Sequence, residues 1–319
     1  MSGQAASRRT LVGLSLDGIG ASTDSGASGV DELVDAARRA EALGFDLIVL
    51  DDPLERAADG RARVSPTDAL AFLARRTTRI GLLATARSHY REPFHVAKEV
   101  ATVDFISSGR AGLLVDPTRT AVADAHFPQA ADLDPTELVA EAAEFAEVVS
   151  ALWDSWEDGA EIREAVTGRY VDNTKIHHID HSGRYFTVKG PLITPRPPQG
   201  QPPLFLLDAP GSGRLAALPG HRIEFLPVPA VYVALAALAA ARATSGTAAG
   251  PVSGTEGSLT LVLTTPPQLV GDILTALEID PAVLGDTPGM APSHLRERLG
   301  IPRPRSRYAG LTGRGDRPA

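Results

Sequence analysis

The sequence predicts an α/β fold built from parallel βαβ units, as either a doubly wound sheet or a (β/α)8 barrel. Strand-like and helix-like stretches alternate four times before Trp156. The strand-like stretches are apolar along their whole length, as expected when both faces of a strand are covered. Polar side chains follow these stretches directly, at the edge where both architectures place a ligand site. They are Asp17, Asp51, Asp52, Thr85 and Asp116.

The first two units show the strand and helix signals most clearly. "LVGLSLDG" is an apolar run ended by Asp-Gly, and "GVDELVDAARRAEALG" follows with apolar residues at helical spacing. Gly44 stands where a helix C-cap belongs. The second strand, "FDLIVLDDP", precedes the helix "SPTDALAFLARRT", in which Ser65 is the expected N-cap and Pro66 the first helical residue.

The third and fourth units complete the regular part of the chain. "RIGLLATA" and "RAGLLVDP" are the expected strands, and "EPFHVAKEVATVDFISSG" and "DPTELVAEAAEFAEVVSALWDSW" are the expected helices. Residues 157–202 are polar, rich in Gly and Pro and too long for an ordinary connection. We therefore expect an inserted loop region that packs on the barrel mouth.

Regular structure resumes after the insertion. "LFLLD", "HRIEFLPV" and "SLTLVLTT" are the expected fifth, sixth and seventh strands, and no eighth strand is evident. The tail is basic and rich in proline, and residues 309–319 are expected to be disordered. We interpret residues 1–319 as a single domain.

Composition excludes several classes of function. The net charge of -8 disfavours nucleic acid and anionic membrane as partners, because both require a cationic surface. The chain has no cysteine, so disulfides, thiolate metal sites and cysteine nucleophiles are excluded. No apolar run is long enough to span a bilayer, and the start has no signal-peptide core. A cytoplasmic location is the default expectation.

The stretch "KIHHIDH" from Lys175 places three histidines and an aspartate close together. A zinc site would need ligands on one face, for example at helical spacing i and i+4. This stretch lies in a Gly-flanked segment without helical periodicity. We therefore favour a structural loop over a metal site.

The sequence resembles the bacterial luciferase-like flavin-dependent monooxygenases, in the branch that contains nitrilotriacetate monooxygenase. The stretches that carry the resemblance are "EPFHVAKEVATVDFISSGRAG", "LWDSWEDGA", "KIHHIDHSGRYFTVKGPLITPRPPQGQP" and "LRERLGIPRPRSRY". It is strong from Phe45 to Arg214 and from Leu295 to Tyr308, and weak from Leu218 to His294. Family members are longer, so the resemblance implies a (β/α)8 TIM barrel that is truncated or degenerate in its last strands.

The resemblance also implies two-component chemistry. A separate flavin reductase supplies reduced FMN, which binds at the carboxyl ends of the strands and reacts with O2 to oxidise a small organic substrate. On this basis Asp52 and Thr85 are expected to position the flavin ring. Ser212, Gly213 and Arg214 are expected to bind its phosphate.

The flavin site implied by the resemblance is only partly retained. The family asparagine of the fourth strand falls on Leu114, and a histidine and a tyrosine of the long helix fall on Pro135 and Val139. Pro210 replaces the phosphate-binding serine and removes an N–H donor. Residues 87–90 are candidate replacements.

Two functions therefore stay open from the sequence. The first is an FMN-dependent monooxygenase that acts on a small organic molecule. The alternative is a noncatalytic relative whose flavin-binding residues are eroded and which serves as a binding or regulatory partner. A homo-oligomer is compatible with either function.

Overall fold

The computed structural model describes most of the chain. The described residues are 11–19, 28–52, 54, 63–128, 132–207, 215–216, 221–227, 258–264, 267–279 and 294–309. The expected disorder of residues 309–319 falls outside them, except for residue 309.

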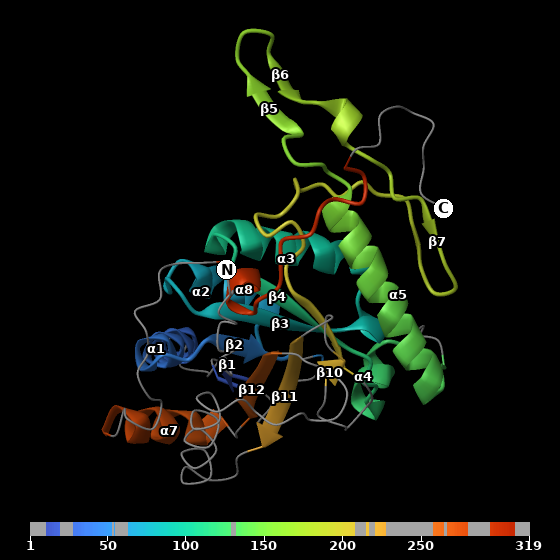
Figure 1. Ribbon diagram of the computed structural model, residues 1–319. Coiled ribbons are helices and arrows are strands. Elements are labelled where there is room, and N and C mark those ends of the chain that lie inside the picture. Colours follow the sequence, from blue (N-terminus) through green and yellow to red (C-terminus); the bar gives the residue numbers. More distant parts are fainter. Residues whose placement is uncertain are drawn as a thin grey trace, which may run out of the picture.

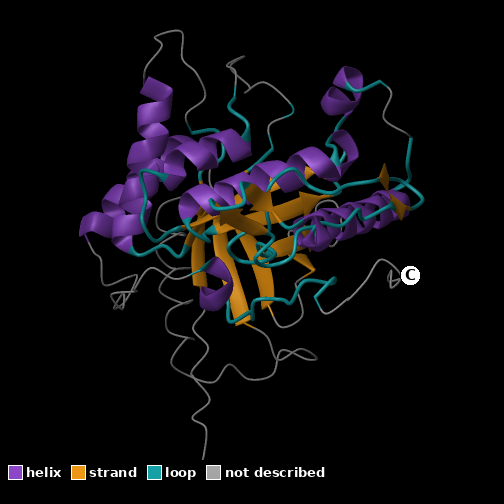
Figure 2. Ribbon diagram, turned by 90° about the horizontal axis from the view of Figure 1, so that it is seen from above, coloured by secondary structure: helices purple, strands orange, loops and turns teal. Residues whose placement is uncertain are grey.

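A curved, mostly parallel sheet forms the centre of the molecule (Figures 1 and 2). Its strand order is β10-β9-β4-β3-β2-β1-β12-β11. All neighbouring strands are parallel except β10, which runs antiparallel to β9. The strands are β1 (Leu11–Ser15), β2 (Leu47–Leu50), β3 (Gly81–Arg87), β4 (Ala111–Asp116), β9 (Leu204–Leu207), β10 (Leu215–Ala216), β11 (His221–Pro227) and β12 (Ser258–Thr264).

The seven parallel strands of the described residues coincide with the seven strands expected from the sequence. The prediction of a parallel α/β sheet is therefore confirmed. The complete (β/α)8 barrel is not, because the hydrogen-bonded ladder of the described residues is open between β10 and β11. What these residues form is a half-barrel, with an interior face and an outer face.

Helices cover the outer face of the sheet (Figure 2). They are α1 (Ser28–Leu43), α2 (Pro66–Ala74), η1 (Ser88–Tyr90), α3 (Pro93–Ser107), α4 (Ala121–His126), α5 (Pro135–Asp154) and α7 (Pro267–Ile279). The larger apolar core lies between these helices and the sheet, and includes Leu14, Ile48, Leu82 and Phe145. Alternate strand residues face the opposite side, as the period of two requires.

The helix boundaries follow the sequence signals. Gly44 ends α1 with a φ of 89°, a conformation that favours glycine. Pro66 begins α2, and Ser65 precedes it without a side-chain capping bond. Asp134 and Glu137 form a full capping box at the start of α5.

The amino end of the half-barrel is closed by α8 (Leu295–Arg298). Leu295 and Leu299 join the interior apolar cluster that contains Leu47, Val49, Leu83, Leu114, Phe205 and Val262. The Leu295 amide donates to the Gly109 carbonyl at 2.8 Å. Gly81 leaves room for this helix, because a Cβ there would lie 2.8 Å from Leu295 Cδ1. The segment forms a floor under the interior.

The inserted region 157–202 does not pack on the barrel mouth, so that expectation is wrong. It contains β5 (Glu161–Glu164), β6 (Arg169–Val171), η2 (Asn173–Lys175), β7 (His181–Ser182) and β8 (Thr187–Val188). Arg196 pairs with Asp154 at 2.8 Å at the last residue of α5, where both side chains are buried. Gln199 Nε2 donates to Asp104 at 2.6 Å near the end of α3. Helices α3 and α5 run back from the carboxyl edge, so these contacts fix the insertion at the amino end.

The second hairpin of the insertion lies along α5. Glu144 accepts hydrogen bonds from the backbone amides of Arg184, Tyr185 and Phe186 at 2.9–3.2 Å. The β5–β6 hairpin projects beyond the end of α5 that is remote from α4 (Figure 1).

Candidate active site at the carboxyl end of the sheet

Polar side chains gather on the interior face at the carboxyl ends of the strands. Alternation from the interior residues Val49 and Leu83 places Asp51, Thr85 and Arg87 on that face. In the same way, Leu114 places Asp116 there. Thr85 is paired with Leu114 across the β3–β4 ladder, and Arg87 is paired with Asp116. We call Asp51, Thr85, Arg87 and Asp116 the mouth cluster.

Arg87 is the cation of the mouth cluster. Its Nη2 lies 3.6 Å from Asp51 and its Nε lies 4.0 Å from Asp116, beyond hydrogen-bond distance in both cases. Its Nε and Nη1 are buried without a hydrogen-bond partner among the described residues. Buried N–H groups are normally satisfied, so this guanidinium is arranged to donate to a ligand.

Asp51 has an altered acidity. Burial, followed by the charge of Asp17, raises its pKa to about 6, and Arg87 opposes this shift. A carboxyl group with this pKa can exchange a proton near neutral pH.

Asp52 lies on the other side of the strand. Its carboxylate accepts from Arg91 Nε at 2.8 Å, from Arg91 Nη2, and from the Arg87 amide at 3.3 Å. Asp52 is only 1% exposed. Its expected contact with flavin stays a prediction, and the structure places Asp51, not Asp52, in the mouth cluster.

The other predicted flavin-binding residues divide into two groups. Thr85 is buried in the mouth beside Leu114, the position where the family resemblance implies an asparagine. Ser212, Gly213 and Arg214 lie outside the described residues, as does Pro210. Their expected phosphate contacts stay predictions.

A buried His–Glu pair was not predicted from the sequence. His89 Nδ1 lies 3.0 Å from Glu141 Oε2, and the histidine side chain is 1% exposed. Its Nε2 has no hydrogen-bond partner among the described residues. Burial raises the pKa of Glu141, while the contact with His89 lowers it. The available signal was the charge of Glu141 within the buried stripe Leu138, Ala142 and Phe145 of α5.

The histidines of "KIHHIDH" have three different partners. His177 Nε2 lies 2.7 Å from Glu157, and its ring stacks on Tyr308 with centroids 4.3 Å apart. His178 Nδ1 lies 2.6 Å from the Gly190 carbonyl, and His181 Nε2 lies 3.0 Å from Glu144. Each ring therefore joins the loop to a different segment, as a structural loop requires.

The comparison with protein families identifies the fold family. The model of the luciferase-like monooxygenases matches residues 11–246. The chain belongs to the luciferase-like monooxygenase family.

Several curated members of the luciferase-like family are similar in sequence. N-acetyl-S-(2-succino)cysteine monooxygenase of Bacillus subtilis is 38% identical over 200 residues, which cover 61% of this chain and 45% of the relative. Nitrilotriacetate monooxygenase component A of Aminobacter aminovorans is 45% identical over 147 residues, 46% of this chain and 32% of the relative. One of two similar subunits of pristinamycin IIA synthase from Streptomyces pristinaespiralis is 32% identical over 292 residues, 87% and 91% of the two chains. The chain thus spans less than half the length of the first two relatives.

Solved structures of luciferase-like proteins share the fold. EDTA monooxygenase from Chelativorans sp. BNC1 has a TM-score of 0.63 at 17% identity, with 93% of this chain and 99% of that chain covered. Long-chain alkane monooxygenase has a TM-score of 0.63 at 16% identity, with 94% and 96% covered. Riboflavin lyase, solved with a modified FMN and riboflavin, is 26% identical with a TM-score of 0.58, and 80% of this chain and 62% of that chain are covered.

Helices of the described residues are too short or too polar to cross a bilayer.

Proposed function

We propose that the chain binds reduced FMN at the mouth of the half-barrel and oxygenates a small organic molecule with O2. Membership of the luciferase-like monooxygenase family carries this proposal. A related protein is named as component A of nitrilotriacetate monooxygenase. By analogy, a separate flavin reductase would supply the reduced cofactor to this chain.

The residues of the mouth cluster fit part of a flavin ring. Arg87 offers two buried N–H groups without partners among the described residues, and a flavin edge presents carbonyl oxygens and ring nitrogens that accept hydrogen bonds. Thr85 offers a buried hydroxyl on the same face. Leu83, Leu114 and Phe205 supply an apolar wall below it. Arg87 is thus the chain's own candidate for a donor that the lost asparagine no longer provides.

The chain's residues would orient the cofactor and control protons. When bound, reduced FMN supplies the electrons for the reaction with O2. The apolar interior would exclude water from the ring face, which strengthens electrostatic contacts there. Asp51, with a pKa of about 6, would hold or release a proton at its carboxyl group beside Arg87.

An anaerobic titration with reduced FMN tests this proposal. We expect saturable binding, and Arg87→Met should weaken it at least tenfold, because a hydrogen bond to a charged group contributes about 1.5–3 kcal/mol. Arg79→Met is the matched control, because exposed Arg79 precedes the amino end of the same strand. No saturable binding up to millimolar FMN would exclude the proposed function.

A second candidate is a noncatalytic partner without its own flavin chemistry. The observation that favours it is the match, along most of both chains, to one of the pristinamycin IIA synthase subunits. The second of these subunits is also similar, at 33% identity over 149 residues. This candidate predicts no FMN binding by the isolated chain, but a stable complex with a related larger chain in sedimentation experiments.

A further inference from the structure

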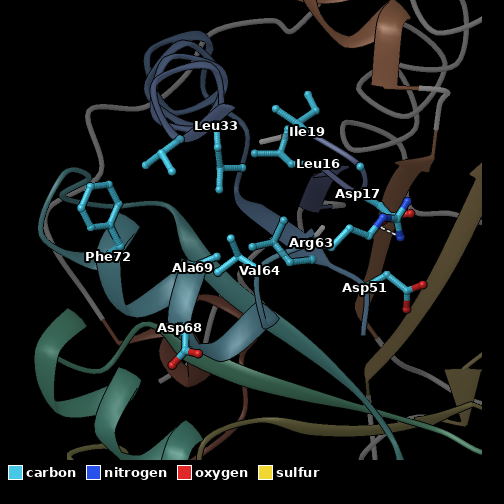
Figure 3. Close-up of a pocket in the computed structure, with 13 residues that line it drawn as sticks. Leu16, Asp17, Ile19, Leu33, Asp51, Arg63, Val64, Asp68, Ala69 and Phe72 are labelled. Atoms are coloured by element: carbon cyan, nitrogen blue, oxygen red, sulfur yellow. Dashed lines mark hydrogen bonds and ion pairs between the residues drawn. The ribbon is translucent and has the colours of Figure 1, made fainter. Parts of the chain in front are cut away.

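A cavity of about 250 Å³ lies between α1 and α2, next to the mouth cluster. Leu33 of α1, Ala69 and Phe72 of α2, and Leu16 and Leu50 at the strand ends form its apolar walls. Figure 3 shows Phe72 at one end, and Asp17, Asp51 and Arg63 at the other. An apolar cavity of about 150 Å³ accommodates benzene, so this one has room for one ring with a short substituent.

The cavity has an accessible apolar edge. Val30, Val64 and Phe72 line it and are 43%, 46% and 39% exposed. Arg76 covers one face of the Phe72 ring at 3.4 Å from its centroid, which fixes the orientation of that ring. Large apolar side chains exposed together around a cavity are typical of a binding site.

The polar end of the cavity has a donor to satisfy. Arg63 Nε is buried without a hydrogen-bond partner among the described residues, while Arg63 Nη1 pairs with Asp17 at 3.3 Å. Asp51 lies 3.6 Å from Arg87. Asp68, the remaining charged residue of the lining, lies on the α2 side, away from Asp17 and Asp51 (Figure 3).

These charges select the type of ligand. An anion would approach the carboxylates of Asp17 and Asp51, and a cation would approach Arg63 and leave its N–H unsatisfied. A neutral ligand with one acceptor oxygen satisfies the N–H without adding a charge.

We propose that the α1–α2 cavity binds a small, uncharged, mainly apolar carbonyl compound, whose oxygen accepts a hydrogen bond from Arg63 Nε. Its role as substrate, though not its binding, rests on the proposed oxygenase function. The position of the cavity beside Asp51 places the polar end of such a ligand next to the mouth cluster.

Four ligands of similar size test the selectivity without flavin. They are acetophenone, which is neutral with an acceptor; ethylbenzene, which lacks the acceptor; benzoate; and 1-phenylethylamine. Saturation-transfer NMR titrations of the full chain should give saturable binding of acetophenone, about tenfold tighter than that of ethylbenzene. Benzoate and the amine should bind more weakly than acetophenone. Tighter binding of either ion, or equal binding of acetophenone and ethylbenzene, would overturn the proposal.

Three variants locate the ligand. Arg63→Met should remove the preference for acetophenone over ethylbenzene, whereas Arg38→Met on α1 should keep it, because Arg38 does not line the cavity. Val64→Trp narrows the cavity at an exposed position and should weaken both ligands at least fivefold. Circular dichroism and thermal melts of each variant establish that it is folded. Unchanged binding by folded Val64→Trp would place the ligand elsewhere and refute the assignment.

Flavin and ketone binding are measured separately, so their failures are distinguishable. Reduced FMN binding without acetophenone binding would overturn the cavity assignment alone. Acetophenone binding without FMN binding would support the cavity assignment and remove the oxygenase function.

Discussion

Restoring an amide at Leu114 is the sharpest test of how the mouth would bind a flavin. Leu114 is 1% exposed and lies directly opposite Thr85 on the interior face. In Leu114→Asn, the new amide would sit beside the Thr85 hydroxyl and could bond a flavin edge. One or two neutral hydrogen bonds at about 0.5–1.5 kcal/mol each correspond to a Kd for reduced FMN that is about two- to tenfold lower.

The same substitution should destabilise the chain without cofactor. Leu114 packs with Leu83 and Phe205 in the interior cluster. Replacing a buried leucine by a smaller polar group should cost about 3 kcal/mol, from lost apolar contacts and a desolvated amide. For a chain of this size the thermal midpoint should fall by about 6–12 °C, and saturating FMN should recover part of that loss.

Leu83→Asn is the matched control, because Leu83 is equally buried but lies one ladder position nearer the floor. It should lower the thermal midpoint similarly and leave the Kd unchanged. Anaerobic fluorescence titration gives the Kd, and calorimetry gives the midpoint. If Leu114→Asn leaves the Kd unchanged, or if Leu83→Asn tightens binding as much, Leu114 does not face the flavin ring.

Three further predictions concern ionised groups. Asp52→Asn breaks the buried pair with Arg91 and should cost about 3–5 kcal/mol in urea unfolding; a loss below about 1 kcal/mol would show that the pair contributes little. The pKa of Asp51 is raised from 3.8 to about 6 in the fold, so its contribution to stability is present below pH 4 and is lost as the pH rises through 6. Asp51→Asn should therefore flatten the dependence of the thermal midpoint on pH between 4 and 7, and an unchanged slope would contradict the altered pKa. Glu144→Ala removes the acceptor of the Arg184, Tyr185 and Phe186 amides and should speed their hydrogen exchange, whereas exchange in β5–β6 should not change.

The strands and helix ends could be predicted because their signals are local. The seven strands are apolar runs bounded by turn residues, and Gly44 and Pro66 mark helix ends through their own backbone preferences. These signals need no knowledge of distant residues.

The side chains of the mouth were predictable only in part. Strand alternation distinguishes Asp51 from Asp52, but the resemblance assigned the flavin contact to Asp52. The pairing of Asp52 with Arg91 joins residues 39 positions apart and has no local signal. The insertion was misplaced for the same reason, since Arg196–Asp154 and Gln199–Asp104 are long-range contacts of buried side chains.

The floor under the interior has a consequence for how the chain is made. Residues 294–308 bond to partners far earlier in the sequence: the carbonyls of Asp46 and Gly109, Asp154 and Gln199. A ribosome delivers these earlier segments first, so the nascent chain must hold its strands together with an open base. The apolar side chains of Leu47 and Leu83 then stay uncovered until Leu295 emerges, and this interval is when the protein most needs a chaperone.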